Sequence, residues 1–128
     1  MVITTGDWYR DQAPYLLQYY ESKDNDDNGG PEPIPDSGLI NDGQNVPIKV
    51  EPGKTYLLRV INQGNFVGTY LEIDDHELTI VEADGVYTEP KMVSRLYLAV
   101  AQRYGVLLTT KETARENYII KCMLDTSQ

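Results

Sequence analysis

The stretch Ile73-Asp-Asp-His-Glu-Leu-Thr-Ile-Val-Glu-Ala-Asp-Gly-Val-Tyr-Thr-Glu-Pro90 predicts two strands joined by a tight turn. Leu78 and Ile80 fall near one face of an extended chain, with Thr79 on the other. The turn is indicated by Asp84-Gly85, because glycine adopts positive φ without a steric penalty. Strand formers follow the turn, and Pro90 is expected to end the second strand. The centre of the chain is therefore predicted to be a β-hairpin.

The only histidine of the chain, His76, stands in this stretch beside Asp74 and Asp75. An imidazole next to carboxylates is compatible with acid–base catalysis. A histidine held in a turn by local hydrogen bonds explains the same residues, and we favour this interpretation. We predict no catalytic residue here.

The charge of the chain disfavours several classes of partner. Among its 128 residues, 20 are Asp or Glu and 11 are Lys or Arg, so the net charge is −9. Such a surface repels phosphate backbones and anionic membranes, so we expect no nucleic-acid or membrane partner. It suits weakly bound divalent cations or basic partners, although acidity also serves solubility alone.

Length and cysteine content indicate one domain over residues 1–128. A chain of this length can bury a hydrophobic core without disulfides. The single cysteine, Cys122, is expected to be a small buried residue in a strand over 118–124. No apolar run approaches the roughly 20 residues of a membrane span, and the first residues do not resemble a signal peptide. We therefore expect a soluble monomer.

Turn signals divide the chain into short strands and one helix. Pro14, at the start of an apolar-periodic run, predicts a helix over 13–21. Besides the hairpin, strands are predicted at 2–5, 38–41, 46–50, 56–61, 69–73, 93–101, 103–109 and 118–124. Short strands at this spacing indicate an all-β, Greek-key sandwich or barrel.

Two arginines, Arg59 and Arg103, interrupt apolar strands. A buried guanidinium without a partner costs several kcal/mol, on the order of other uncompensated charges. We therefore predict that both are paired with carboxylates, and Glu82 and Asp84 are the expected partners.

The segment 22–35 is rich in Asp, Asn, Gly and Pro, which predicts an acidic surface loop, mobile at least over 23–30. Asp24, Asp26 and Asn28 alternate as in a calcium loop, but no glutamate closes the motif at its twelfth position. Calcium binding is therefore disfavoured. Ten tyrosines are compatible with a sugar-binding surface, yet tyrosine rings at the rims of sheets explain the same composition.

A series of short sequence motifs is spread in order along residues 6–125. They are Asp7-Trp8-Tyr9 with Asp11, Glu32-Pro-Ile-Pro-Asp-Ser37 with Leu39-Ile-Asn41, Val50-Glu-Pro-Gly-Lys-Thr-Tyr56 with Leu58-Arg59, Asp75-His76-Glu77, Thr79-Ile-Val-Glu82, Asp84-Gly85, and Leu96-Tyr97 with Ala101-Gln-Arg-Tyr104. Together they resemble the middle domain of fungal multicopper oxidases, most closely the iron-uptake ferroxidases, with laccases as related members. The resemblance implies a cupredoxin-like fold.

In that family, three cupredoxin domains share one chain, and the first and third domains bind the copper ions. A blue-copper site uses two His, one Cys and usually an axial Met. This chain has one histidine, and Cys122 and Met123 are adjacent, so they point to opposite faces of a strand. The resemblance therefore implies a copper-free spacer domain without cofactor, in which His76 is not a ligand. Neighbouring oxidase domains would be its partners, in a parent protein that is secreted or anchored at the cell surface.

The resemblance also implies one candidate substrate-binding residue. Ferroxidases of this family bind ferrous ion through carboxylates, one of which lies in the Glu-Pro-Ile-Pro phrase, and Glu32 matches it. A second middle-domain acid would precede the later Leu-Tyr, where Ser94 stands instead. Half of the expected iron ligands from this domain are therefore missing.

Three further departures place charge where the family has other residues: Arg10, Glu72 and Arg95. Such positions could face a neighbour in a three-domain chain, so we interpret these residues as the mark of a domain adapted or engineered to live alone. Ordinary divergence is the alternative explanation.

Three functions remain open: the copper-free structural domain, a binding scaffold with function on loops such as 22–35, and an electron-transfer cupredoxin. The single histidine argues against the last. We expect an isolated chain without oxidase activity and without a high-affinity copper site.

Overall fold

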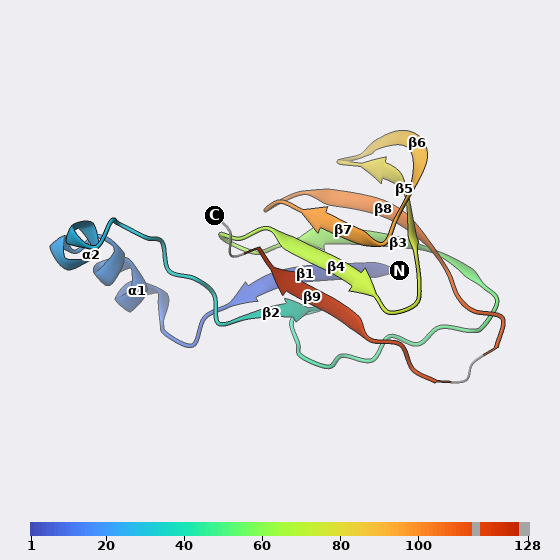
Figure 1. The fold of residues 1–128 in the computed structure, drawn as a ribbon, viewed down its shortest axis with the longest axis horizontal. Helices are drawn as coiled ribbons and strands as arrows, with labels where there is room; N and C mark the ends of the chain where they lie inside the picture. The colour runs from blue at the N-terminus through green and yellow to red at the C-terminus, as the bar shows by residue number, and fades with distance from the viewer. Residues whose placement is uncertain (114–115, 126–128) are drawn as a thin grey trace.

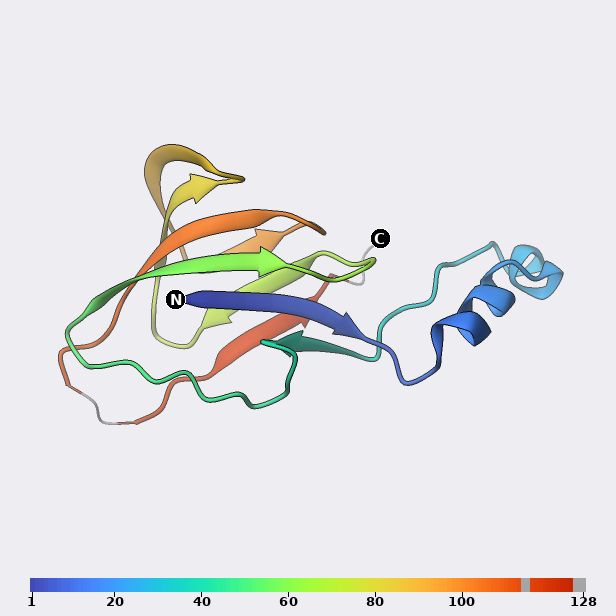
Figure 2. The same cartoon turned by 180° about the vertical axis from the view of Figure 1, so that it is seen from behind.

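The structure, a computed structural model, describes residues 1–113 and 116–125. Two sheets make up the body of the molecule (Figure 1, and from behind in Figure 2). The larger has the strand order β2-β1-β3-β8-β5-β6 and the smaller β7-β4-β9. The strands are β1 Val2–Trp8, β2 Ser37–Ile40, β3 Thr55–Asn62, β4 Thr69–Ile73, β5 Leu78–Ala83, β6 Val86–Val93, β7 Arg95–Leu98, β8 Arg103–Thr109 and β9 Ile120–Leu124.

The order of the strands is that of a Greek-key sandwich. β1 pairs in parallel with β3, whereas β3 with β8, β8 with β5 and β4 with both its neighbours are antiparallel. Sequence neighbours such as β3 and β4 lie in different sheets, so the chain repeatedly crosses between them. The predicted all-β, cupredoxin-like fold class is confirmed.

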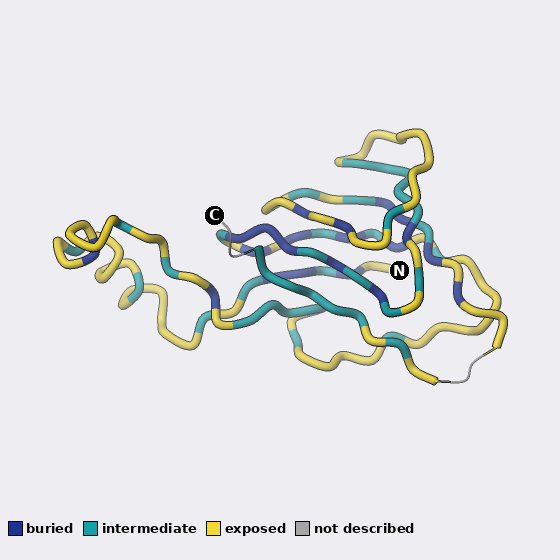
Figure 3. Tube along the Cα trace, in the orientation of Figure 1, coloured by how far each residue is buried: buried dark blue, intermediate teal, exposed yellow. Residues whose placement is uncertain are grey.

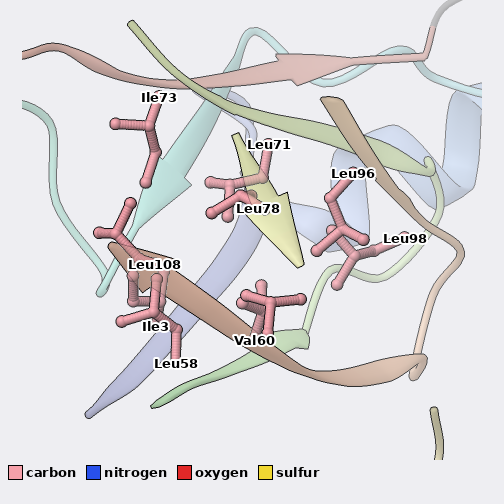
Figure 4. Packing of buried hydrophobic residues seen from close by; sticks show 10 residues of the cluster. Ile3, Leu58, Val60, Leu71, Ile73, Leu78, Leu96, Leu98 and Leu108 are labelled. Atoms are coloured by element: carbon pink, nitrogen blue, oxygen red, sulfur yellow. The ribbon is translucent and has the colours of Figure 1, made fainter. Parts of the chain in front are cut away.

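The core fills the space between the two sheets. Figure 3 shows buried residues concentrated along the facing strands, and Figure 4 shows the apolar side chains that meet there. The buried cluster comprises Ile3, Leu58, Val60, Leu71, Ile73, Leu78, Leu96, Leu98, Val106 and Leu108. Burial of each such side chain stabilises the fold by about 1.5–3 kcal/mol. Alternate residues of β4 and β7 point inward, as period-two patterning requires.

The central hairpin forms as predicted, from β5 and β6. Its turn residues Asp84 and Gly85 have φ values of 48° and 87°, the pair of positive angles that a type I′ turn needs. The expectation that Pro90 ends the second strand was wrong, because β6 continues to Val93. Pro90 has no registered partner on β5, because the β5–β6 register shifts beside it, so its missing N–H leaves no ladder bond unmade.

Two other strand predictions need correction. Residues 46–50 form no strand, although Ile48 packs against the core. Pro47 cannot donate a ladder hydrogen bond, which weakens strand pairing there. The strand expected at 93–101 is split, because β6 ends at Val93 in one sheet and β7 begins at Arg95 in the other.

The helix expected at 13–21 is present as α1, Ala13–Tyr20, but a second helix was not predicted. It is α2, Lys23–Asp27, within the segment expected to be an irregular loop. Its N-cap, Ser22, accepts a hydrogen bond from the backbone N–H of Asn25 at 3.2 Å. Asp24 and Asp26 lie in its first turn, where negative charge stabilises a helix. Residues 11–35, hereafter the helical arm, project from the sandwich in both views.

Candidate functional site

The candidate iron ligand Glu32 lies on the segment that returns from α2 to β2, next to Pro33, whose carbonyl oxygen contacts the Tyr9 hydroxyl. Its side chain is exposed, and it makes no hydrogen bond or ion pair with any described residue. A free carboxylate on the surface can accept a cation without first losing a partner. One carboxylate alone holds a divalent cation only weakly, because such ions take several oxygen ligands.

Two other acids near the arm base already have partners. Asp7 Oδ2 accepts the backbone N–H groups of Asn65 at 2.8 Å and Phe66 at 3.0 Å. Asp36 Oδ2 accepts the backbone N–H of Arg10 at 2.9 Å. These carboxylates therefore hold loops together, and Glu32 differs from both in having no such bond.

A tyrosine hydroxyl lies beside Glu32. Tyr9 Oη donates to the carbonyl oxygen of Pro33 at 3.2 Å. Burial, followed by the negative charges of Asp7 and Glu32, raises the pKa of the Tyr9 hydroxyl. The group is therefore a neutral hydrogen-bond donor at neutral pH, and it fixes the backbone next to Glu32.

Ser94 does not lie near Glu32. The β4–β7 ladder pairs Thr69 with Leu98 and Glu72 with Arg95, so Ser94 precedes the end of β7 that lies farthest from the arm. There it lines a hollow of about 340 Å³ together with Glu72, Ile73, Asp75, His76 and Glu77. Within this chain, the two positions that the resemblance linked to iron therefore do not form one site.

His76 is a turn residue, as we favoured. Its Nδ1 lies 2.8 Å from the carbonyl oxygen of Asp74, and its ring meets that of Tyr118 edge-on, with 4.6 Å between centroids. Asp75 adopts a left-handed φ of 57° and completes the turn. The imidazole is thus occupied by local contacts on one nitrogen and by an aromatic neighbour.

The thiol of Cys122 is half-buried where β9 passes β2. A β-carbon at Gly38 would lie 3.1 Å from Cys122 Sγ, so this sulfur packs against β2. Burial raises the pKa of the thiol to about 11, whereas copper binds the thiolate. Met123, the next residue of β9, points to the opposite face of the strand. One imidazole and one protonated thiol do not fit a blue-copper site.

The described residues offer no other metal centre, since no group of three or more His, Cys, Asp or Glu side chains is arranged to hold an ion. Among the same residues, no helix has the length and apolar character needed to cross a membrane.

The prediction for the strand arginines was half right. Arg59 forms an ion pair with Glu82, which is only 14% exposed at its side chain. Arg103 is exposed, and within the described residues its guanidinium has no carboxylate partner. Asp84 instead accepts the backbone N–H of Arg103 at 2.9 Å. Because the Arg103 guanidinium is solvated by water, it needs no carboxylate partner.

The polar departures Glu72 and Arg95 face one another on the outer side of the smaller sheet. Arg95 contacts Glu72 at 3.1 Å, and its guanidinium lies 5.6 Å from the ring centroid of Tyr70. Lys121 pairs with both Glu72 and Asp74. The third departure, Arg10, is 85% exposed and lies 3.9 Å from Asp36.

Sequence reasoning missed the apolar surface of the arm. Tyr15 is 62% exposed, Leu17 54% and Tyr19 47%. The signal was present in the sequence, since the predicted helix has apolar or aromatic residues on all sides.

A Greek-key sandwich of this topology defines a cupredoxin-like domain. The profile of the multicopper oxidases matches residues 1–128, so the chain belongs to the multicopper oxidase family. This confirms the resemblance drawn from the sequence phrases.

The relatives of this chain include iron-transport oxidases. It is 44% identical over 131 residues to the iron transport multicopper oxidase FET3 of Candida albicans, covering 99% of this chain and 20% of that protein. It is 46% identical over 127 residues to the iron transport multicopper oxidase fio1 of Schizosaccharomyces pombe, covering 98% and 20%. The crystal structure of Fet3p, described as a multicopper oxidase that functions in iron import, matches with a TM-score of 0.91 and 40% identity, over 98% of this chain and 23% of that one. The chain thus spans about a fifth of the length of these curated relatives.

Proposed function

We propose that this chain is a copper-free structural domain, the middle one, of a multicopper oxidase of the iron-transport type, and that it is not catalytic by itself. The observation that carries the proposal is the donor set. His76 contacts Asp74 and Tyr118, and partial burial raises the pKa of the Cys122 thiol to about 11. Copper in the assembled oxidase would then be bound by its other domains, and this domain would hold them in place.

Within that assembly, Glu32 is the residue that we assign to ferrous ion as substrate. Two observations support this assignment. The Glu32 side chain is exposed and accepts no hydrogen bond from a described residue, whereas Asp7 and Asp36 both accept hydrogen bonds from backbone N–H groups. Further ligands would come from a neighbouring domain, since Ser94 lies just before the end of β7 that is farthest from the helical arm and offers no carboxylate.

A domain adapted to live alone is the second candidate. The ion pairs of Glu72, Arg95 and Lys121 favour it, because they make the outer face of the smaller sheet polar. The exposed apolar side chains of the arm argue against it, since they are poorly suited to permanent contact with water. We therefore place the chain in an assembly.

Metal titration of the isolated chain tests the copper-free assignment. We expect no intense absorbance from thiolate-to-copper charge transfer, no stoichiometric tight copper, and ferrous oxidation no faster than with metal alone. A blue band of one equivalent, or turnover above that control, would overturn the assignment.

A chimera tests the role of Glu32. Replacing the matching segment of the Candida albicans FET3 protein by this chain supplies the other domains. We expect Glu32→Gln to lower kcat/KM for ferrous ion by about tenfold or more, because one charged ligand is lost. Glu89→Gln, at an exposed acid of edge strand β6 that lines neither site, is the control and should leave kcat/KM unchanged. Equal values for the two variants would remove Glu32 from the substrate site.

A further inference from the structure

Helix α1 is apolar on all sides, yet none of its residues is buried. Its sequence, Ala-Pro-Tyr-Leu-Leu-Gln-Tyr-Tyr, contains a single polar residue, Gln18. A helix that is hydrophobic all round is normally buried within a protein. The exposed fractions of Tyr15, Leu17 and Tyr19 are 62%, 54% and 47%. These side chains therefore lack the cover that their composition calls for.

The rest of the chain does not provide that cover. α2 packs against α1 but consists of Lys, Asp and Asn residues only. In Figures 1 and 2 the arm extends away from both sheets, so the core of the sandwich does not reach it. The cover must come from outside the described residues.

The arm is nevertheless held in a defined shape. At its base, Asp36 N–H donates to the Trp8 carbonyl at 2.9 Å, and the Tyr9 hydroxyl donates to the Pro33 carbonyl at 3.2 Å. At its tip, Asn25 is 1% exposed and its Nδ2 donates to the Tyr20 carbonyl at 3.0 Å, which ties α2 to the end of α1. A surface ordered in advance loses less conformational entropy when a partner binds.

The match to Fet3p also supports a cover for α1 that comes from outside the described residues. The helical arm makes up about a fifth of this chain, and the match covers 98% of the chain with a TM-score of 0.91. The arm is therefore included in the aligned part of an experimental structure whose chain is more than four times longer. In that longer chain, other segments are available to contact it.

We propose that the helical arm is an interdomain clamp that inserts α1 between apolar surfaces of the neighbouring domains of the parent oxidase. This rests on the proposed function. The arm carries six carboxylates and one lysine, Lys23, so the apolar patch that receives it should be bordered by Lys and Arg. A second copy of this chain is a poorer occupant, since its own net charge of −9 would repel the acidic arm.

The test compares two double variants in two settings. Leu17→Asn/Tyr19→Asn removes apolar surface, and the matched control Leu17→Met/Tyr19→Phe retains it. Each is made in the isolated chain and in the Candida albicans FET3 chimera. The measurements are the melting temperature, the rate of protease cleavage within residues 21–31, and the sedimentation behaviour of the isolated chain.

We expect the Asn variant to melt like the wild type when isolated, because no α1 residue belongs to the core cluster or is among the side chains packed against it. In the chimera it should lower the melting temperature and accelerate cleavage within the arm by about tenfold, since docking suppresses local opening. The control should match the wild type in both settings. Equal effects of the Asn variant in both settings, or none in the chimera, would overturn the clamp.

The remaining outcomes are also decisive. If the isolated wild-type chain self-associates and the Asn variant is monomeric, a second copy of the chain covers α1. That result would overturn the proposal that a neighbouring domain covers it. A chimera that fails to fold with the wild-type arm would refute the proposed function, and the clamp with it. A chimera that folds but ignores the Asn variant would refute the clamp alone.

Discussion

The hydroxyl groups of Thr5 and Thr69 lie 2.9 Å apart in the interior and join the two sheets. Thr5 belongs to β1 of the larger sheet and Thr69 to β4 of the smaller one, and neither side chain is exposed to solvent. A buried hydrogen bond is directional, so this pair sets where the start of β4 lies over β1. The apolar contacts around it have no such directional preference.

Single and double Thr→Val substitutions should separate the contribution of the Thr5–Thr69 hydrogen bond to stability from that of side-chain packing. We predict that Thr69→Val, which keeps the shape, costs about 1–3 kcal/mol because the Thr5 hydroxyl is left without a partner. The double variant Thr5→Val/Thr69→Val should recover most of that loss, since neither site then buries an unpaired hydroxyl. Urea unfolding of the two singles, the double and the wild type measures this, and strictly additive losses would contradict it.

Gly38 should be required where β2 passes β9. A β-carbon there would lie 3.0 Å from the Cys122 carbonyl oxygen and 3.1 Å from its sulfur. We therefore expect Gly38→Ala to destabilise the fold by about 1–3 kcal/mol, as overpacking does. Gly6→Ala is the matched control on β1, because its β-carbon would meet Gln63 Cγ at an ordinary 3.6 Å. Equal thermal stabilities of the two variants would rule out a close approach.

The Arg59–Glu82 pair should contribute more to stability than Arg10–Asp36. Glu82 is 14% exposed, so Arg59→Met leaves a carboxylate that is poorly solvated and without its counter-charge. We predict a loss of about 1–3 kcal/mol for this change. The pair of Arg10 with Asp36 is exposed and 3.9 Å long, so Arg10→Met should cost less than about 0.5 kcal/mol. Unfolding by chemical denaturant measures the loss of free energy in each variant, and a larger loss for Arg10→Met than for Arg59→Met would contradict the prediction.

Cys122 should react slowly with thiol reagents at pH 8 in the folded chain and quickly in urea. Burial raises the pKa of the thiol from 9.0 to about 11, so the folded state holds the neutral form. The resulting stabilisation is complete below pH 9 and is lost as the pH rises toward 11, because the unfolded chain releases its proton first. The difference in unfolding free energy between wild type and Cys122→Ala should shrink over that window. A fast reaction at pH 8 without denaturant would show that the thiol is accessible and ionised.

Local features of the chain were predictable from sequence where neighbouring residues decide them. The Asp84-Gly85 turn needs positive φ, and Pro14 favours the first helical turn, so the hairpin and α1 followed directly. α2 was missed because its acids were interpreted as a sign of disorder, whereas Ser22 caps a helix whose first turn they stabilise.

Sequence alone determined that this chain is an all-β member of the multicopper oxidase family, and that it carries one histidine and one cysteine, whereas a blue-copper site uses two histidines and one cysteine. Counting donors needs no coordinates. Only the tertiary structure decided that Ser94 lies far from Glu32, that Glu82 pairs with Arg59, and that no residue of α1 is buried. Each of these depends on which distant segments the sheets bring together, and strand pairing is not encoded in any local pattern.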